Sequence, residues 1–185
     1  FDEKTVALLH SQVFGLLYNV LAFYELYKDK NLSPTLPLVR GGRRVGSENV
    51  LDQWILARLD ELIKLTTENL DNYKLLEPTR AIKEFIGDLS TWYLRRSRER
   101  IKEGDKEARQ TLYFVLKNLT KVMAPFAPFT AEDIWLKLKI AGDEESVHLT
   151  EWPHLTPSPL SLLRRKGGEE RSKIIKEMNT VRNIV

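Results

Sequence analysis

The chain of 185 residues contains no cysteine, only three histidines and only nine glycines. The absence of cysteine excludes disulfide bonds, thiolate catalysis and cysteine-ligated zinc. The histidines are not spaced like metal ligands, so we expect no metal site. No apolar run approaches the ~20 residues that cross a bilayer, so we expect no membrane span. With 42% apolar and 30% charged residues, the composition indicates about one soluble globular domain.

The chain begins FDEKTVALLH, without methionine and without a basic start, an apolar stretch and a cleavage site. We therefore expect no secretory signal, a cytoplasmic location and a piece of a longer protein. The formal net charge of +3 is small. Any binding of a polyanion should then depend on local clusters of arginine and lysine.

Glycines and prolines leave long uninterrupted stretches, which is typical of a helical protein. Ser47, Asp105 and Thr130 are the predicted N-caps, and Pro78 suits a first helical position. Asp133, three residues after Thr130, completes a sequence that resembles a capping box. A loop is predicted between the first two helices. The predicted helices cover residues 2–30, 48–70, 77–104, 106–123 and 130–138.

The sequence after Gly142 has a different character. ESVHLTEWPHL alternates apolar and polar residues and then turns at Pro153, which predicts an extended segment laid on the helices. Residues 154–168 are a predicted linker and residues 169–185 a final helix. The fold class is therefore all-α: an antiparallel helix bundle over residues 1–153, with an extended C-terminal segment and a final helix. Such a bundle does not by itself indicate a function.

Four arginines follow two aromatic residues in the stretch WYLRRSRER, residues 92–100. On a helical wheel at about 100° per residue, Arg96 and Arg100 fall on the apolar side, whereas Arg95 and Arg98 point to the flank and the solvent. The apolar side carries Ile82, Phe85, Ile86, Leu89, Trp92 and Tyr93.

Two interpretations of this stretch are open. Arg96 and Arg100 pair with acidic side chains of neighbouring helices while Trp92 fills the core, or the arginines contact phosphates or bases and Trp92 is a stacking platform. Asn19 raises a similar choice, because its amide suits either a base edge or a helix packing seam. A second basic cluster, in the predicted loop, is suited either to phosphate contact or to solvation. It consists of Arg40, Arg43 and Arg44.

Four phrases of the sequence are typical of one family: LDQWILARLDELI, TRAIKEFIGDLSTWYLRRSRERI, TLYFVLKNLTKVMAPFAPFTAEDIW and ESVHLTEWP. They resemble the helical anticodon-binding domain of the class I isoleucyl-tRNA synthetases. The valyl and leucyl enzymes share LDQWILARLDELI and the MAPF.PF element, whereas STWYLRRSRER with SVHLTEWP favours the isoleucyl branch. LLYNVLAFYELY lies at the family's W-N-V-x-x-F position, with Tyr18 in place of the usual Trp, and MNTVRNIV resembles the start of the junction to a C-terminal module.

The resemblance implies a monomeric domain that binds the anticodon stem-loop of isoleucine tRNA. The alternatives are the equivalent domain of a valyl or leucyl synthetase and a helical scaffold that binds a protein through its apolar stripes. The candidate tRNA-binding residues are Asn19, Trp92, Arg95, Arg96, Arg98, Arg100, Arg40, Arg43 and Arg44.

The catalytic signatures HIGH and KMSKS of class I synthetases do not occur in the sequence. We therefore expect no catalytic residue in this chain and no amino-acid activation by the chain alone. The resemblance implies ATP with Mg for the parent enzyme, and Zn for a C-terminal module of the parent. We expect no cofactor in this chain.

Overall fold

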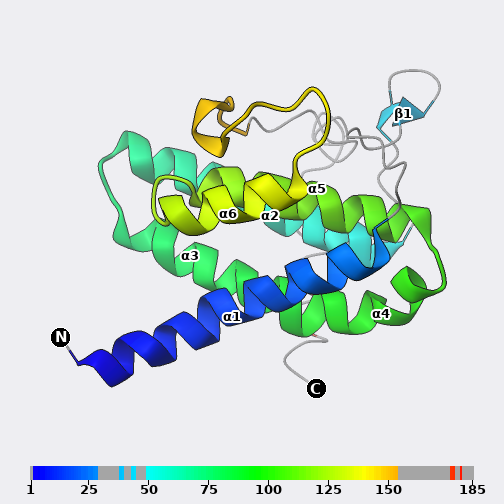
Figure 1. The fold of residues 1–185 in the computed structure, drawn as a ribbon, viewed down its shortest axis with the longest axis horizontal. Coiled ribbons are helices and arrows are strands. Elements are labelled where there is room, and N and C mark those ends of the chain that lie inside the picture. The colour runs from blue at the N-terminus through cyan, green and yellow to red at the C-terminus, as the bar shows by residue number, and fades with distance from the viewer. Residues whose placement is uncertain are drawn as a thin grey trace.

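The computed structural model describes residues 2–28, 38–39, 43–44, 49–153, 176–177 and 180. Helices pack antiparallel around one hydrophobic core, so the predicted all-α fold is confirmed (Figure 1). The elements are α1 (Glu3–Tyr27), α2 (Val50–Asp71), α3 (Leu76–Gly87), the π-helical segment η1 (Asp88–Leu94), α4 (Arg95–Lys102), α5 (Lys106–Met123), α6 (Pro128–Leu138) and the 3-10 turn η2 (Val147–Leu149). None of the described helices combines the length and apolarity that crossing a bilayer requires.

The predicted loop after α1 contains one short antiparallel pair. In this pair β1 (Leu38–Val39) lies against β2 (Arg43–Arg44), with Leu38 opposite Arg44 and Val39 opposite Arg43. Arg40 lies outside the described residues. The pair is two residues long on each side and leaves the fold class unchanged.

Three of the predicted helix starts differ from the structure. Asn49, not Ser47, caps α2, since its side chain accepts a hydrogen bond from the Leu51 amide at 2.9 Å. Helix α3 begins at Leu76, which places Pro78 later in the first turn, where its missing N–H is still harmless. Asp105 caps α5 as predicted.

The predicted capping box of α6 is the third wrong start. The helix begins at Pro128 after Ala127, and no side chain caps it. Proline suits a first helical position because its φ is fixed and its N–H is not needed. The Asp133 carboxylate instead accepts hydrogen bonds from the Tyr18 hydroxyl, at 2.9 Å, and from Lys137. Tyr18 therefore ties α1 to α6.

The predicted third helix is one continuous rod in which α3, η1 and α4 follow one another without a break. In η1 the backbone bonds join residues five apart, which makes each turn wider than an α-turn. Gly104 ends the rod with a φ of +96°, as expected for a glycine after a helix. The wider turns change which side chains of the rod face the core.

The core joins all of the longer helices. Trp54 and Trp135 are fully buried in it, whereas the first half of α1 projects beyond the bundle (Figure 1). Residues 145–153 were predicted to be extended and do lie on the helices, but Val147–Leu149 form a 3-10 turn because the Ser146 side chain accepts from the His148 amide. The predicted linker lies outside the described residues, as does most of the final helix, of which residues 176–177 and 180 are described and helical.

Candidate nucleic-acid interface

A groove of about 600 Å³ lies between the second half of α1 and the stretch from η1 into α4. It brings together three of the predicted site residues, Asn19, Arg95 and Arg98, which lie far apart in the sequence. The remaining lining is apolar or carries a small hydroxyl, and no carboxylate belongs to the lining among the residues that the structure describes. The lining residues are Asn19, Ala22, Phe23, Leu26, Ser90, Leu94, Arg95 and Arg98.

The wall from α1 follows from helical spacing. Its four lining residues are separated by three, one and three positions, which places them on one face of an α-helix. Asn19 is exposed, and its amide offers both a donor and an acceptor to the groove. Phe23 forms the floor with 9% of its surface exposed, while Leu26 is 73% exposed at the rim. Exposed apolar surface next to a polar amide is a suitable surface for a planar, partly polar group.

The wall from η1 and α4 carries the positive charge. Arg95 and Arg98 are both exposed, and no ion pair to either is found among the residues that the structure describes. The Arg98 guanidinium carbon lies 5.2 Å from the centre of the Phe23 ring, so its charge is held over the groove floor. The groove therefore combines two cations, one amide and an apolar floor.

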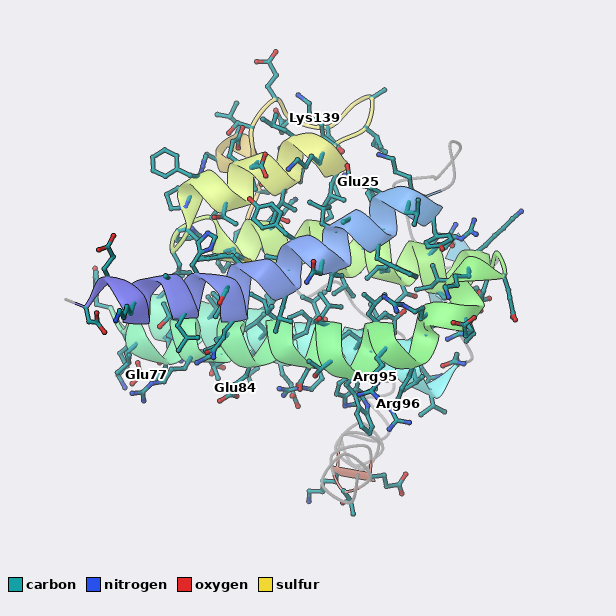
Figure 2. The ribbon with its side chains drawn as sticks, turned by 60° about the horizontal axis from the view of Figure 1, so that its bottom comes forward. Glu25, Glu77, Glu84, Arg95, Arg96 and Lys139 are labelled. Carbon is teal, nitrogen blue, oxygen red and sulfur yellow. The ribbon has the colours of Figure 1, made fainter. Side chains whose placement is uncertain are left out.

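Trp92 and Arg96 form a separate pair next to this groove. The Arg96 guanidinium carbon lies 3.7 Å from the centre of the Trp92 indole. Trp92 is only 8% exposed, and its indole nitrogen has no hydrogen-bond partner in the described part of the chain. The Trp92 ring is thus covered by Arg96 and by the core, which supports the core interpretation of this residue. Figure 2 shows Arg95 and Arg96 together at one edge of the bundle, away from Lys139.

The helical wheel placed Arg96 incorrectly. It predicted Arg96 on the apolar side, but the side chain is exposed. After the wide turns of η1 the buried positions are Ser97 and Ile101. In a straight α-helix at about 100° per residue, Ile101 would lie roughly 160° away from Phe85. The π-helical segment removes much of this drift, so both residues are buried in the same core.

Arg100 is held inside the protein. Its Nη1 and Nη2 donate to the two Asp52 carboxylate oxygens at 3.2 and 3.1 Å, and its Nε donates to Asp105 at 3.0 Å. Burial lowers the pKa of Arg100, but the hydrogen bonds and charges of the two carboxylates outweigh it and raise the pKa above the ordinary value. For Arg100 the interpretation as an internal ion pair is the one that the structure supports.

The sequence indicated only part of the groove lining. Asn19, Arg95 and Arg98 were candidates, whereas Phe23, Leu26, Ser90 and Leu94 were not. Phe23 and Leu26 could have been found from their spacing to Asn19 along one helix face. Ser90 and Leu94 could not, because their direction depends on η1.

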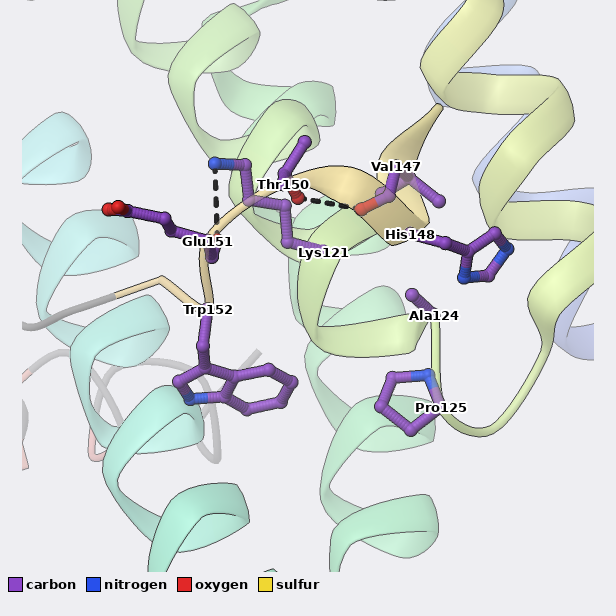
Figure 3. A pocket seen from close by; sticks show the side chains of 8 residues that line it. All are labelled: Lys121, Ala124, Pro125, Val147, His148, Thr150, Glu151 and Trp152. Atoms are coloured by element: carbon purple, nitrogen blue, oxygen red, sulfur yellow. Dashed lines mark hydrogen bonds between the residues drawn. The ribbon is translucent and has the colours of Figure 1, made fainter. Parts of the chain in front are cut away.

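A second hollow, of about 250 Å³, lies between the end of α5 and residues 147–152 (Figure 3). Lys121 reaches the Glu151 carbonyl at 3.5 Å, and its pKa is lowered first by burial and then by the charge of Lys117. Trp152 closes one side, and its Nε1 donates to the Thr67 hydroxyl at 3.0 Å. These contacts fasten the C-terminal segment to the bundle, so we assign no binding site to this hollow.

Comparison with known proteins gives a consistent result. A family model described as the anticodon-binding domain of tRNA ligase matches residues 52–185. The chain is similar to the isoleucine–tRNA ligases of Clostridium kluyveri and Clostridium novyi, each 38% identical over 99% of the chain and 18% of the relative. It is also similar to that of Chlamydia muridarum, 38% identical over 84% of the chain and 15% of the relative. The chain thus spans less than a fifth of the length of these relatives.

Proposed function

Because the chain belongs to the anticodon-binding domains of tRNA ligases, we propose that it binds tRNA through the groove between α1 and the stretch from η1 into α4. The observation that carries the proposal is that Arg95 and Arg98 are exposed and form no ion pair within the described part of the chain, with Arg98 above the Phe23 ring and an exposed amide opposite. The relatives are named isoleucine–tRNA ligases, so the ligand that we propose is the anticodon stem-loop of isoleucine tRNA.

Each part of the groove suits one part of an unpaired loop. Unpaired bases are recognised by stacking on flat side chains and by hydrogen bonds to their edges. Phe23, Leu26 and Leu94 offer the apolar surface against which a base can lie. Asn19 offers the hydrogen-bond groups that distinguish one base edge from another. Arg95 and Arg98 hold the flanking phosphates, which fixes the position of the loop without reading its sequence.

In the longer protein, this domain would hold the anticodon end of the tRNA while other domains attach isoleucine with ATP. We propose that the domain acts as a monomer in the cytoplasm and uses no cofactor of its own. The chain alone should give no isoleucine-dependent exchange of pyrophosphate into ATP, since it lacks HIGH and KMSKS. An exchange signal from the purified chain would contradict this part of the proposal.

The test is a titration of the chain with a fluorescent isoleucine tRNA anticodon stem-loop at two salt concentrations. The double variant Arg95→Ala/Arg98→Ala removes two cations from the groove. We expect weaker binding and a slope of log affinity against log salt that is smaller by roughly 1.4 to 1.8, or about 0.7 to 0.9 for each phosphate contact.

A matched control is Lys4→Ala/Lys139→Ala, which removes the same charge from exposed positions outside the groove. The control should change the affinity little. Equal losses in both double variants would mean that only net charge matters and would reject the groove as the site. Valine and leucine stem-loops measured in the same way distinguish the isoleucyl assignment from the two related ones.

A further inference from the structure

Two ion pairs of opposite polarity join α2 to the rod of α3, η1 and α4, one at each side of the π-helical segment. At its start, Arg58 of α2 donates to Asp88 through Nε and Nη2 at 3.2 and 3.1 Å. Beyond its end, Asp52 of α2 accepts from Arg100 of α4. Because α2 and the rod run antiparallel, the two pairs hold both ends of η1 against one helix.

Asp52 has the more central place of the two acids. Its side chain is fully buried, and its Oδ1 also accepts from the Tyr93 hydroxyl at 2.9 Å. Tyr93 lies inside η1 and is fully buried as well. Burial, followed by the charge of Asp52, holds the pKa of Tyr93 well above its usual range. A single carboxylate on α2 thus bonds both the π-helical segment and α4.

These bonds fix the rotation of α4. A buried carboxylate with several directed donors accepts only a narrow range of geometries, whereas apolar contacts tolerate small rotations. Rotating the rod about its own axis would move Tyr93 and Arg100 away from Asp52. It would also move Arg95 and Arg98 relative to Asn19 on α1. The distance between these two walls determines the width of the groove.

We infer that Asp52 is a positioning residue for RNA binding: through Tyr93 and Arg100 it sets the register in which Arg95 and Arg98 face the groove. This inference rests on the proposed function of the groove. Asp52 is fully buried and does not line the groove, so it acts only through the residues that it holds. π-helical turns are frequent at functional sites, and here the π-helical segment sets the direction in which the arginines that follow it point.

The test uses Asp52→Asn, which keeps the shape of the side chain and an acceptor for Tyr93 but removes the charge that pairs with Arg100. Asp105 remains as an ion-pair partner of Arg100, which favours a folded variant. We expect the anticodon stem-loop of isoleucine tRNA to bind about 3- to 30-fold more weakly, the range expected for changes that act at a distance. Circular dichroism should show unchanged helical content.

A double-mutant cycle separates positioning from general stability. If Asp52 acts through the groove arginines, Asp52→Asn in the Arg95→Ala/Arg98→Ala background should weaken binding by less than about 2-fold. The matched control is Asp143→Asn, which breaks the Lys117–Asp143 ion pair, 2.6 Å long and outside the groove lining. It should lower the melting temperature and leave RNA affinity unchanged.

The outcomes are distinguishable. If the groove double variant binds as well as the parent chain, the proposed function fails. If that variant binds weakly but Asp52→Asn binds normally, or if their effects add, only the positioning role fails. If Asp52→Asn is unfolded, Arg100→Lys provides the second measurement. It keeps the charge but not the two parallel hydrogen bonds, so a positioning role predicts an intermediate loss of affinity and a normal fold.

Discussion

Arg98 and Arg100 are two positions apart and have opposite surroundings. Arg98 is exposed above the Phe23 ring, with no ion pair in the described part of the chain, whereas Arg100 is bonded to two carboxylates. A row of arginines in a sequence is therefore not a uniform surface. The bonds that each guanidinium already makes determine which ones remain available to a ligand.

Substitution of these two arginines should affect the stability of the fold very differently. Arg100→Ala leaves the fully buried Asp52 without its cation, so the free energy of unfolding should fall by roughly 3 kcal/mol. Arg98→Ala removes an exposed side chain and should change it by less than about 1 kcal/mol. Urea unfolding at neutral pH measures both values. A small loss for Arg100→Ala would show that Asp52 finds another partner.

Two buried tyrosines, Tyr93 and Tyr113, should ionise at a higher pH than an ordinary tyrosine. Burial and then the charge of Asp143 raise the pKa of Tyr113 to about 12, and burial also raises the pKa of Tyr93. Neutral Tyr93 and Tyr113 stabilise the fold fully below pH 10, and this contribution is lost as the pH rises through their raised pKa values.

An ultraviolet titration of tyrosinate absorbance measures these ionisations. We expect a late step, above the ordinary tyrosine pKa of about 10, that accompanies unfolding. Tyr93→Phe should reduce this late step. Ionisation of all the tyrosines in one step near pH 10, with helicity retained, would contradict the burial of the Tyr93 hydroxyl.

At the scale of the element, the start of α5 combines a cap with an ion pair. Asp105 accepts from the amides of Glu107 and Ala108 and also from Arg100. Partial burial raises the pKa of Asp105, but the Ala108 amide, Arg100 and the Glu107 amide outweigh it and lower the pKa below 3.8. A lowered carboxyl pKa stabilises the fold above pH 3.8, and this contribution is lost as the pH falls through the lowered value.

Two variants of this cap give different results. Asp105→Ala loses the cap and should destabilise the protein by about 1 kcal/mol or more at neutral pH. Asp105→Asn keeps a capping oxygen and loses only the charge. Its loss of stability relative to the parent chain should therefore shrink as the pH falls well below 3.8. Melting temperatures at neutral and acidic pH check both. A deficit of Asp105→Asn that is independent of pH would show that the charge contributes nothing.

The sequence predicted some features of the helices correctly and others incorrectly. Helical periodicity and the cap at Asp105 predicted the bundle, because both are local signals. The caps predicted at Ser47 and Thr130 were wrong. The residues at the N-cap positions, Asn49 and Ala127, lie within three positions of the predicted ones, and local sequence does not choose among such neighbours.

The error at Arg96 has a different origin. The wheel assumed a uniform α-helix, and the turns of η1 change the register of everything that follows. In the observed register of α4, Tyr93 and Arg100 donate hydrogen bonds to Asp52, which lies more than forty positions earlier in the sequence. Spacing along α1 could therefore have predicted Phe23 and Leu26, whereas the places of Ser90 and Leu94 in the groove could not have been predicted.

At the scale of the whole molecule, the groove and the C-terminal segment are at different parts of the bundle. In Figure 1, α4 and the turn η2 lie on opposite sides of the fold. Residues 147–153 are held there by Trp152, whose indole donates to Thr67 of α2, and by the buried Val147. This segment stabilises the bundle without contributing to the groove lining.

Stability and RNA binding should therefore change independently. Trp152→Phe keeps an aromatic ring but removes the hydrogen bond to Thr67, so it should destabilise the fold by about 1 kcal/mol and speed hydrogen exchange in residues 147–152. Its affinity for the stem-loop should equal that of the parent chain. In the double variant with Arg98→Ala, the changes in the free energy of unfolding should add, and so should the changes in the free energy of binding, since distant sites without shared partners act independently. A loss of affinity in Trp152→Phe alone would instead show that the C-terminal segment influences the groove through the core, because α2 carries both Thr67 and Asp52.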